Sequence, residues 1–159
     1  MIQPMKFAVL ADIHGNSSAL TAVLDDMRTL GVSEGVNLGD HFSGPLDASG
    51  TADLLLAPGF HSIGGNHDRW LVEKDPENMG PSDKVAYTQL SKPHLDWLKA
   101  LPTTCQVFEE VFLCHGTPDS DLTYWLERVE PDGAVRRSTL KEIEDEAEGV
   151  DASLILCGH

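Results

Sequence analysis

Short apolar runs alternate with longer amphipathic stretches along the first part of the chain. Residues 7–11 form a continuous apolar run of strand length, which is typical of a strand covered on both faces. Residues 17–30 place apolar side chains at steps of three and four and predict a helix. The pattern continues with a strand at 36–38, a helix at 51–57 and a strand at 60–63. This β-α-β-α-β order predicts an α/β fold with a parallel sheet.

The second half of the chain is less regular. Residues 73–82 are polar with two prolines and predict a loop, and residues 84–101 predict two helical segments interrupted at Pro93. Residues 117–133 carry no predicted element. The remaining predicted elements are strands at 105–108, 111–114 and 154–157 and a charged helix at 136–148. Because neither a repeat nor a linker divides the sequence, we expect one domain over residues 1–159.

The amino-acid composition restricts the classes of partner that we expect the protein to bind. The chain has 11 Lys and Arg against 26 Asp and Glu, a formal net charge of −15, and a sequence pI of about 4.6. Such a surface repels polyanions, which makes a long nucleic acid a poor partner. No run approaches the 18 apolar residues of a membrane span, so we expect no membrane partner and a cytoplasmic location. The three cysteines lack Cys-x-x-Cys spacing and predict reduced thiols.

Histidines, carboxylates and one asparagine gather directly after the predicted strands, where open α/β sheets bind ligands. These residues are Asp12, His14, Asp40, Asn66, His67, Asp68, His115 and His159. Imidazole mixed with carboxylate suits Mn, Fe, Zn or Ni, whereas Ca and Mg sites use mainly oxygen ligands. A carboxylate such as Asp40 can bridge two ions. The pattern therefore predicts a site for a pair of divalent metal ions.

Each of these motifs also has an ordinary structural explanation. Asp12 is acceptable as a turn or cap residue, Gly39-Asp40 is a common turn pair, and His115 suits a buried edge position. The tetrad at 65–68, Gly-Asn-His-Asp, is the strong element, since residue usage places it by chance in about one such chain in a thousand. Five such motifs after five apolar strands favour the metal site.

In this order the motifs resemble those of the calcineurin-like metallophosphoesterase superfamily, over essentially the whole chain. Residues 39–45 and 113–118 are most similar to small bacterial and archaeal members of the YfcE type. Protein phosphatases of the superfamily carry Gly-Asp-x-x-Asp-Arg-Gly, whereas residues 39–45 read Gly-Asp-His-Phe-Ser-Gly-Pro, which disfavours a phosphoprotein substrate. The resemblance implies a metallophosphoesterase-type α/β sandwich, in which two sheets are flanked by helices.

The resemblance also implies roles for the polar residues. The ligand set is Asp12 and His14 for one ion, Asn66, His115 and His159 for the other, and Asp40 for both. His67 would donate a proton to the leaving oxygen or contact the phosphoryl group, with Asp68 orienting its ring. The cofactor is two divalent ions, Mn foremost, with Fe, Zn or Ni open. The implied reaction is hydrolysis of a phosphomonoester, phosphodiester or nucleotide by a metal-activated water.

One departure from the family pattern concerns the last motif. The family carries Gly-His-x-His followed by further strands, and this sequence ends at His159. We therefore expect a domain incomplete at its C-terminal side, with the first ion short of one ligand. The alternative function is a non-catalytic relative that binds a metal or a partner. Trp70, Tyr124 and Trp125 either line a substrate pocket or pack, and His41 either touches substrate or packs.

Overall fold

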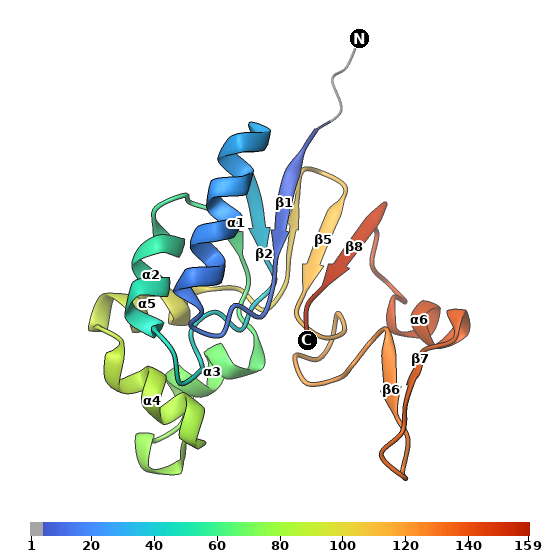
Figure 1. Ribbon diagram of the computed structural model, residues 1–159. Coiled ribbons are helices and arrows are strands. Elements are labelled where there is room, and N and C mark those ends of the chain that lie inside the picture. The colour runs from blue at the N-terminus through green and yellow to red at the C-terminus, as the bar shows by residue number, and fades with distance from the viewer. Residues whose placement is uncertain (1–4) are drawn as a thin grey trace.

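Two β-sheets pack against each other, and helices cover the outer face of the first (Figure 1). The computed structural model describes residues 5–159. The first sheet is parallel, in the order β1 (Phe7–Leu10), β2 (Glu34–Asn37), β3 (His61–Ser62). The second has the order β4 (Cys105–Val107), β5 (Val111–Cys114), β8 (Leu154–Cys157), with β4 antiparallel and β8 parallel to β5. The α/β architecture with two sheets agrees with the expected fold class.

Five helices follow or connect the strands of the first half and gather on one side of the first sheet (Figure 1). They are α1 (Ser17–Leu30), α2 (Ala48–Leu56), α3 (Asn66–Glu73), α4 (Pro81–Gln89) and α5 (Lys92–Ala100), with a short 3-10 turn at Pro76–Asn78. A hairpin of β6 (Glu127–Val129) and β7 (Val135–Arg137), followed by α6 (Leu140–Glu146), stands beside the second sheet. No helix within residues 5–159 combines the length and apolar character that crossing a membrane requires.

Two apolar clusters hold these layers together. One lies between the helices and the first sheet and contains the fully buried Phe42 together with Leu20, Leu55 and Leu71. The other lies between the sheets. It consists of Val36, Leu38, Ile63, Val107, Val111 and Leu113. Because Val36 and Leu38 belong to the second cluster and Phe42 to the first, the segment that follows β2 is held by both.

The predicted loop at 73–82 ends earlier than expected, because α4 begins at Pro81, and the predicted break between the two helical segments lies at 90–91 instead of at Pro93. Pro81 is the first residue of α4 and Pro93 is the second residue of α5, and proline is tolerated at both because those N–H groups have no partner within the helix. Helix α3, which begins within the Gly-Asn-His-Asp tetrad, has no counterpart among the predicted elements.

The predicted helix at 136–148 begins too early. Residues 135–137 are strand β7, which pairs with β6 inside the segment that carried no predicted element. The Thr139 hydroxyl accepts a hydrogen bond from the Glu142 N–H, and the Glu142 carboxylate accepts one from the Thr139 N–H. This capping box starts α6 at Leu140.

The three cysteines are free thiols, and Cys114 is buried. Burial, with a smaller contribution from the neighbouring Cys157, raises the pKa of the Cys114 thiol to about 12, and burial also raises the pKa values of Cys105 and Cys157. Since only the thiolate is alkylated, we expect iodoacetamide at about pH 8 to label native Cys114 at least tenfold more slowly than the denatured chain. Peptide mass spectrometry over time measures this, and equal rates in the two states would contradict it.

Candidate metal centre

The loops after β1 and β2 continue the pairing of these strands and bring the first three candidate ligands together. The backbone N–H groups of Asp12, His14 and Gly15 donate to the carbonyls of Gly39, Asp40 and His41, each at 3.0 Å. Since the strands are parallel, both loops leave the sheet at its carboxyl edge. Asp12 and His14 therefore lie beside Asp40.

Four of the candidate ligands have a left-handed backbone, which residues other than glycine rarely adopt. Their φ values are +52° for Asp12, +48° for His14, +55° for Asp40 and +54° for His159. Non-glycine residues in this region cost about 1–3 kcal/mol each and cluster at functional sites. The strain concentrates at the sheet edge where these side chains converge.

Two glycines allow the start of α3 to approach this edge. A Cβ on Gly39 would lie 2.6 Å from the backbone nitrogen of Gly65, and one on Gly65 would lie 2.3 Å from Oδ1 of Asp40. Both distances are too short for any side chain. Glycine at both positions lets the residues from Asn66 onward reach the carboxylate of Asp40.

Two groups of side chains can each hold a metal ion, and Asp40 belongs to both. In each group the ligand atoms lie within 4.8 Å of one another. The groups are Asp12, His14 and Asp40, and Asp40, His115 and His159. His159 also donates its backbone N–H to Asp12 Oδ2 at 3.2 Å, which ties the end of the chain to the first group. A shared carboxylate between two imidazole-containing groups fits a pair of divalent ions.

The rings of His14 and His115 are oriented by backbone carbonyls. Nδ1 of His14 lies 2.8 Å from the carbonyl oxygen of Ser43, and Nδ1 of His115 lies 2.7 Å from that of Leu38. A carbonyl only accepts, so Nδ1 carries the hydrogen in both rings. The Nε2 atoms then face Asp40 Oδ2 at 3.7 and 3.4 Å. Histidines that bind metals are fixed in the same way.

Asn66 lies beside the second group, in the first turn of α3. Its Oδ1 lies 3.1 Å from Nε2 of His115, and both side chains are buried. Burial opposes protonation of His115, but its hydrogen bond and charge interaction with Asp40 outweigh this and raise its pKa to about 9. Nε2 of His115 thus faces the oxygens of Asp40 and Asn66, and this donor set fits a cation.

The side chains of His67 and Asp68 have different partners, which are Asp83 and His41. The predicted orientation of the His67 ring by Asp68 is therefore wrong. Asp68 points into the turn after β2, where its carboxylate accepts backbone hydrogen bonds from Asp40, His41 and Gly65 at 2.8, 3.0 and 2.9 Å. It also lies 2.7 Å from Nδ1 of His41. Asp68 therefore holds the segment that carries Asp40. His41 is fully buried, which agrees with packing, one of the two roles considered for it.

Asp83 is the residue at the site that the sequence interpretation missed. Its Oδ1 lies 2.7 Å from Nδ1 of His67, and Ser43 Oγ contacts both groups. The available signal was the helix start at Gly80-Pro81, with an acidic residue in the first turn. The predicted elements leave Asp83 between the loop at 73–82 and the helical segment that begins at 84.

Two of the three aromatic candidates lie at the centre. Tyr124 stacks on His159, with ring centroids 4.6 Å apart and planes at 17°, and Trp70 meets His67 edge-on at 4.6 Å. Trp125 is buried, and its Nε1 donates to the Ile143 carbonyl. Trp125 packs, whereas Tyr124, which is 45% exposed, is available to a ligand.

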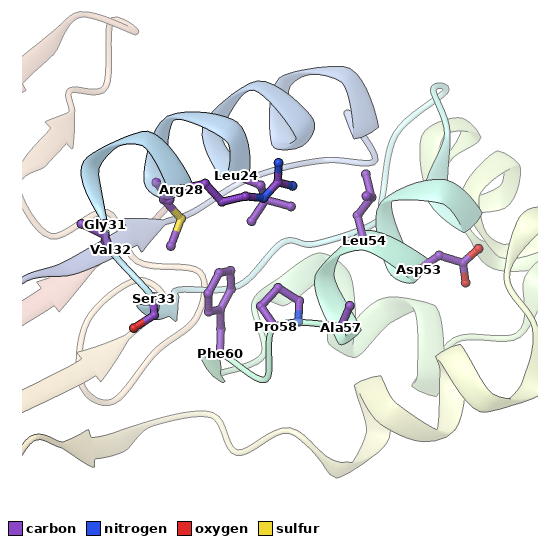
Figure 2. Close-up of a pocket in the computed structure, with 11 residues that line it drawn as sticks. Leu24, Arg28, Gly31, Val32, Ser33, Asp53, Leu54, Ala57, Pro58 and Phe60 are labelled. Carbon is purple, nitrogen blue, oxygen red and sulfur yellow. The ribbon is translucent and has the colours of Figure 1, made fainter.

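Small hollows adjoin the centre. One of about 280 Å³ lies beside Tyr124 and His159, and a second of about 290 Å³ lies beside His115, with Arg69 and Thr117 in its wall. A more apolar hollow of about 550 Å³ lies elsewhere, between the C-terminal ends of α1 and α2 (Figure 2). None of the candidate metal ligands lines this larger hollow. The two smaller hollows are therefore the ones that adjoin the candidate site.

Residues 5–159 match the family model for calcineurin-like phosphoesterases, and the chain belongs to this family. The uncharacterized protein MJ0912 of Methanocaldococcus jannaschii is 33% identical over 107 residues, which cover 64% of this chain and 44% of that protein.

A solved structure shows the same fold. The metallophosphoesterase from Sphaerobacter thermophilus superposes with a TM-score of 0.74 at 23% identity, covering 99% of this chain and 61% of that one. The phosphoesterase YfcE from E. coli is similar at a TM-score of 0.45 and 22% identity, covering 73% of this chain and 62% of that one. The chain thus spans less than two thirds of each of these proteins and of MJ0912.

Proposed function

We propose that the chain is a metal-dependent hydrolase of small phosphate esters with a binuclear centre. The observation that carries the proposal is the carboxylate of Asp40, which is shared by two groups of ligand atoms. Asp12 and His14 would hold one ion, and Asn66, His115 and His159 the other. Two bound ions activate a water nucleophile and neutralise phosphoryl oxygens.

The side chains of the centre have separate tasks in this proposal. The carbonyls of Ser43 and Leu38 hold His14 and His115 with Nε2 directed at Asp40. His67 is partly exposed at 29% of its side chain, and its ring lies 5.4 Å from that of His14. It is placed to donate a proton to the leaving oxygen, a contribution of about 10²–10⁴ in rate.

The surroundings of the centre support a small substrate, either a simple phosphate ester or a nucleotide. The adjoining hollows measure about 280 and 290 Å³, and the exposed ring of Tyr124 offers a stacking surface for an aromatic group. The net charge of −15 disfavours a long polyanion. Among metals we propose Mn, which favours carboxylate and carbonyl oxygens such as those of Asp12, Asp40 and Asn66. We propose a cytoplasmic location, because three free cysteines fit a reducing compartment.

The test is hydrolysis by chelator-treated protein reloaded separately with Mn²⁺, Zn²⁺, Ni²⁺ and Mg²⁺. p-Nitrophenyl phosphate reports monoesterase activity and bis-p-nitrophenyl phosphate reports diesterase activity. We expect metal-dependent turnover that His67→Ala lowers by about 10²–10⁴. His61→Ala, an exposed histidine on β3, is the matched control and is expected to match wild type.

A wild-type rate no higher than that of His67→Ala with every metal would contradict the hydrolase proposal. Retention of divalent ions without turnover would then favour the non-catalytic alternative. Elemental analysis of the same samples separates these two outcomes.

A further inference from the structure

We propose that Asp83, together with Ser43, is a positioning residue that fixes the ring of His67. The inference rests on the proposed function only for its catalytic consequence, since the arrangement of the three side chains stands without it. Nδ1 of His67 lies 2.7 Å from Oδ1 of Asp83, and Ser43 Oγ lies 2.5 Å from the same oxygen. Ser43 Oγ also lies 3.2 Å from Nδ1 of His67.

The chemistry of the three groups sets the direction of these hydrogen bonds. An ionised carboxylate only accepts, so the Ser43 hydroxyl and Nδ1 of His67 both donate to Asp83. Nδ1 therefore carries a hydrogen, and Nε2 is the ring nitrogen left for the substrate side. Within residues 5–159, Nε2 of His67 has no hydrogen-bond partner, whereas Nδ1 has two close oxygens.

Asp83 is held firmly enough to act as a fixed acceptor. Its side chain is 4% exposed and lies in the first turn of α4, where the helix dipole favours a negative charge. Helix α4 packs against α3, which carries His67. The acceptor and the ring thus belong to two packed helices rather than to a mobile loop.

Ser43 links this pair to the metal centre. Its backbone carbonyl accepts from Nδ1 of His14, while its side chain contacts Asp83 and His67. The rings of His14 and His67 meet edge-on, with centroids 5.4 Å apart and planes at 80°. One residue therefore sets the orientation of a candidate ligand and of the candidate proton donor.

The first test measures which nitrogen of the His67 ring is protonated, and it does not depend on enzymatic activity. Long-range ¹H–¹⁵N correlation spectra of metal-free protein at about pH 8.5, with His67 assigned through His67→Ala, report which ring nitrogen is protonated. We expect a protonated Nδ1 in wild type and in Asp26→Ala, a matched exposed carboxylate on α1. Asp83→Ala is expected to shift the Nδ1 signal to that of an unprotonated nitrogen. An unchanged signal in Asp83→Ala would overturn the proposal.

The second test compares the loss of kcat for two phosphate esters whose leaving groups differ in basicity. A displaced proton donor costs most when the leaving oxygen is basic, so Asp83→Ala is expected to lower kcat for phenyl phosphate by about 10–100-fold. The loss for p-nitrophenyl phosphate is expected to be smaller, with KM unchanged for both. Equal losses on the two esters would indicate a merely structural role and overturn the proposal.

A relocated carboxylate provides the rescue. Position 43 already places a side-chain atom 3.2 Å from Nδ1 of His67, so Ser43→Asp in the Asp83→Ala background puts a carboxylate within reach. We expect this double variant to recover the signal of a protonated Nδ1. We also expect it to hydrolyse phenyl phosphate at least tenfold faster than Asp83→Ala does. Absence of recovery of the signal in a folded double variant counts against the proposal. If wild type hydrolyses no ester, the proposed function fails while the spectra still decide the role of Asp83.

Discussion

Asp40→Asn is expected to abolish binding of both metal ions and, with it, phosphate-ester hydrolysis. Asp40 is 2% exposed, belongs to both ligand groups, and its Oδ2 faces the Nε2 atoms of His14 and His115. An amide in its place retains one oxygen and loses the negative charge, so neither group keeps a full set of donors. The rate is expected to fall by more than the 10–100-fold that loss of an outer partner of a metal ligand costs.

The measurement is the number of ions per chain by elemental analysis after dialysis against a metal buffer, followed by the rate with both p-nitrophenyl esters. Asp26→Asn, an exposed carboxylate on α1, is the matched control and is expected to retain wild-type values. Circular dichroism checks that the variant is folded. A folded Asp40→Asn chain that keeps two ions would rule out a shared carboxylate at this position.

Asp68→Asn is expected to cost about 3–5 kcal/mol in the free energy of unfolding, the range for breaking one partner of a buried pair. The Asp68 carboxylate accepts three backbone hydrogen bonds and contacts the His41 ring, and both side chains are buried. In asparagine an NH₂ group replaces one oxygen and faces N–H donors. Urea unfolding measures the difference, and Asp96→Asn, in an exposed pair with Lys92, is expected to change little.

The stability difference should depend on pH in a defined direction. Burial raises the pKa of Asp68, but the charge and hydrogen bond of His41 and the backbone donors outweigh it, so the pKa lies below its ordinary value. A lowered pKa contributes stability above the unfolded pKa of about 4, and that stability is lost as the pH falls through the folded value. The gap between wild type and Asp68→Asn should therefore be constant above about pH 5 and narrow below it. A gap that widens with acid would contradict the assignment.

The sequence is informative where short-range patterns decide the structure. The helix predicted at 17–30 has the bounds of α1, because its apolar spacing, the Asn16 cap and Gly31 all act within a few residues. The strands of both sheets were placed to within a few residues for the same reason. Since parallel strands share a carboxyl edge, the order of motifs also indicated which polar side chains would lie close together there.

Long-range contacts are what the sequence concealed. The partner of His67 is Asp83, which lies 16 residues away and on another helix, whereas the adjacent Asp68 points toward His41. Neighbouring residues on a helix project in different directions, so adjacency in the tetrad was a poor guide. The pairing of β6 with β7 depended on a turn within a segment without apolar periodicity.

The left-handed backbone at Asp12, His14 and Asp40 sets a conflict between stability and activity. Glycine adopts this conformation without steric cost, so Asp12→Gly relieves strain even though it removes a candidate ligand. Screens that select only for thermal stability are therefore expected to favour glycine at these positions and to yield better-folded chains that no longer bind metal. Attempts to raise the thermal stability of this protein should leave positions 12, 14 and 40 unchanged. Stabilising substitutions are better sought in the exposed hairpin of β6 and β7.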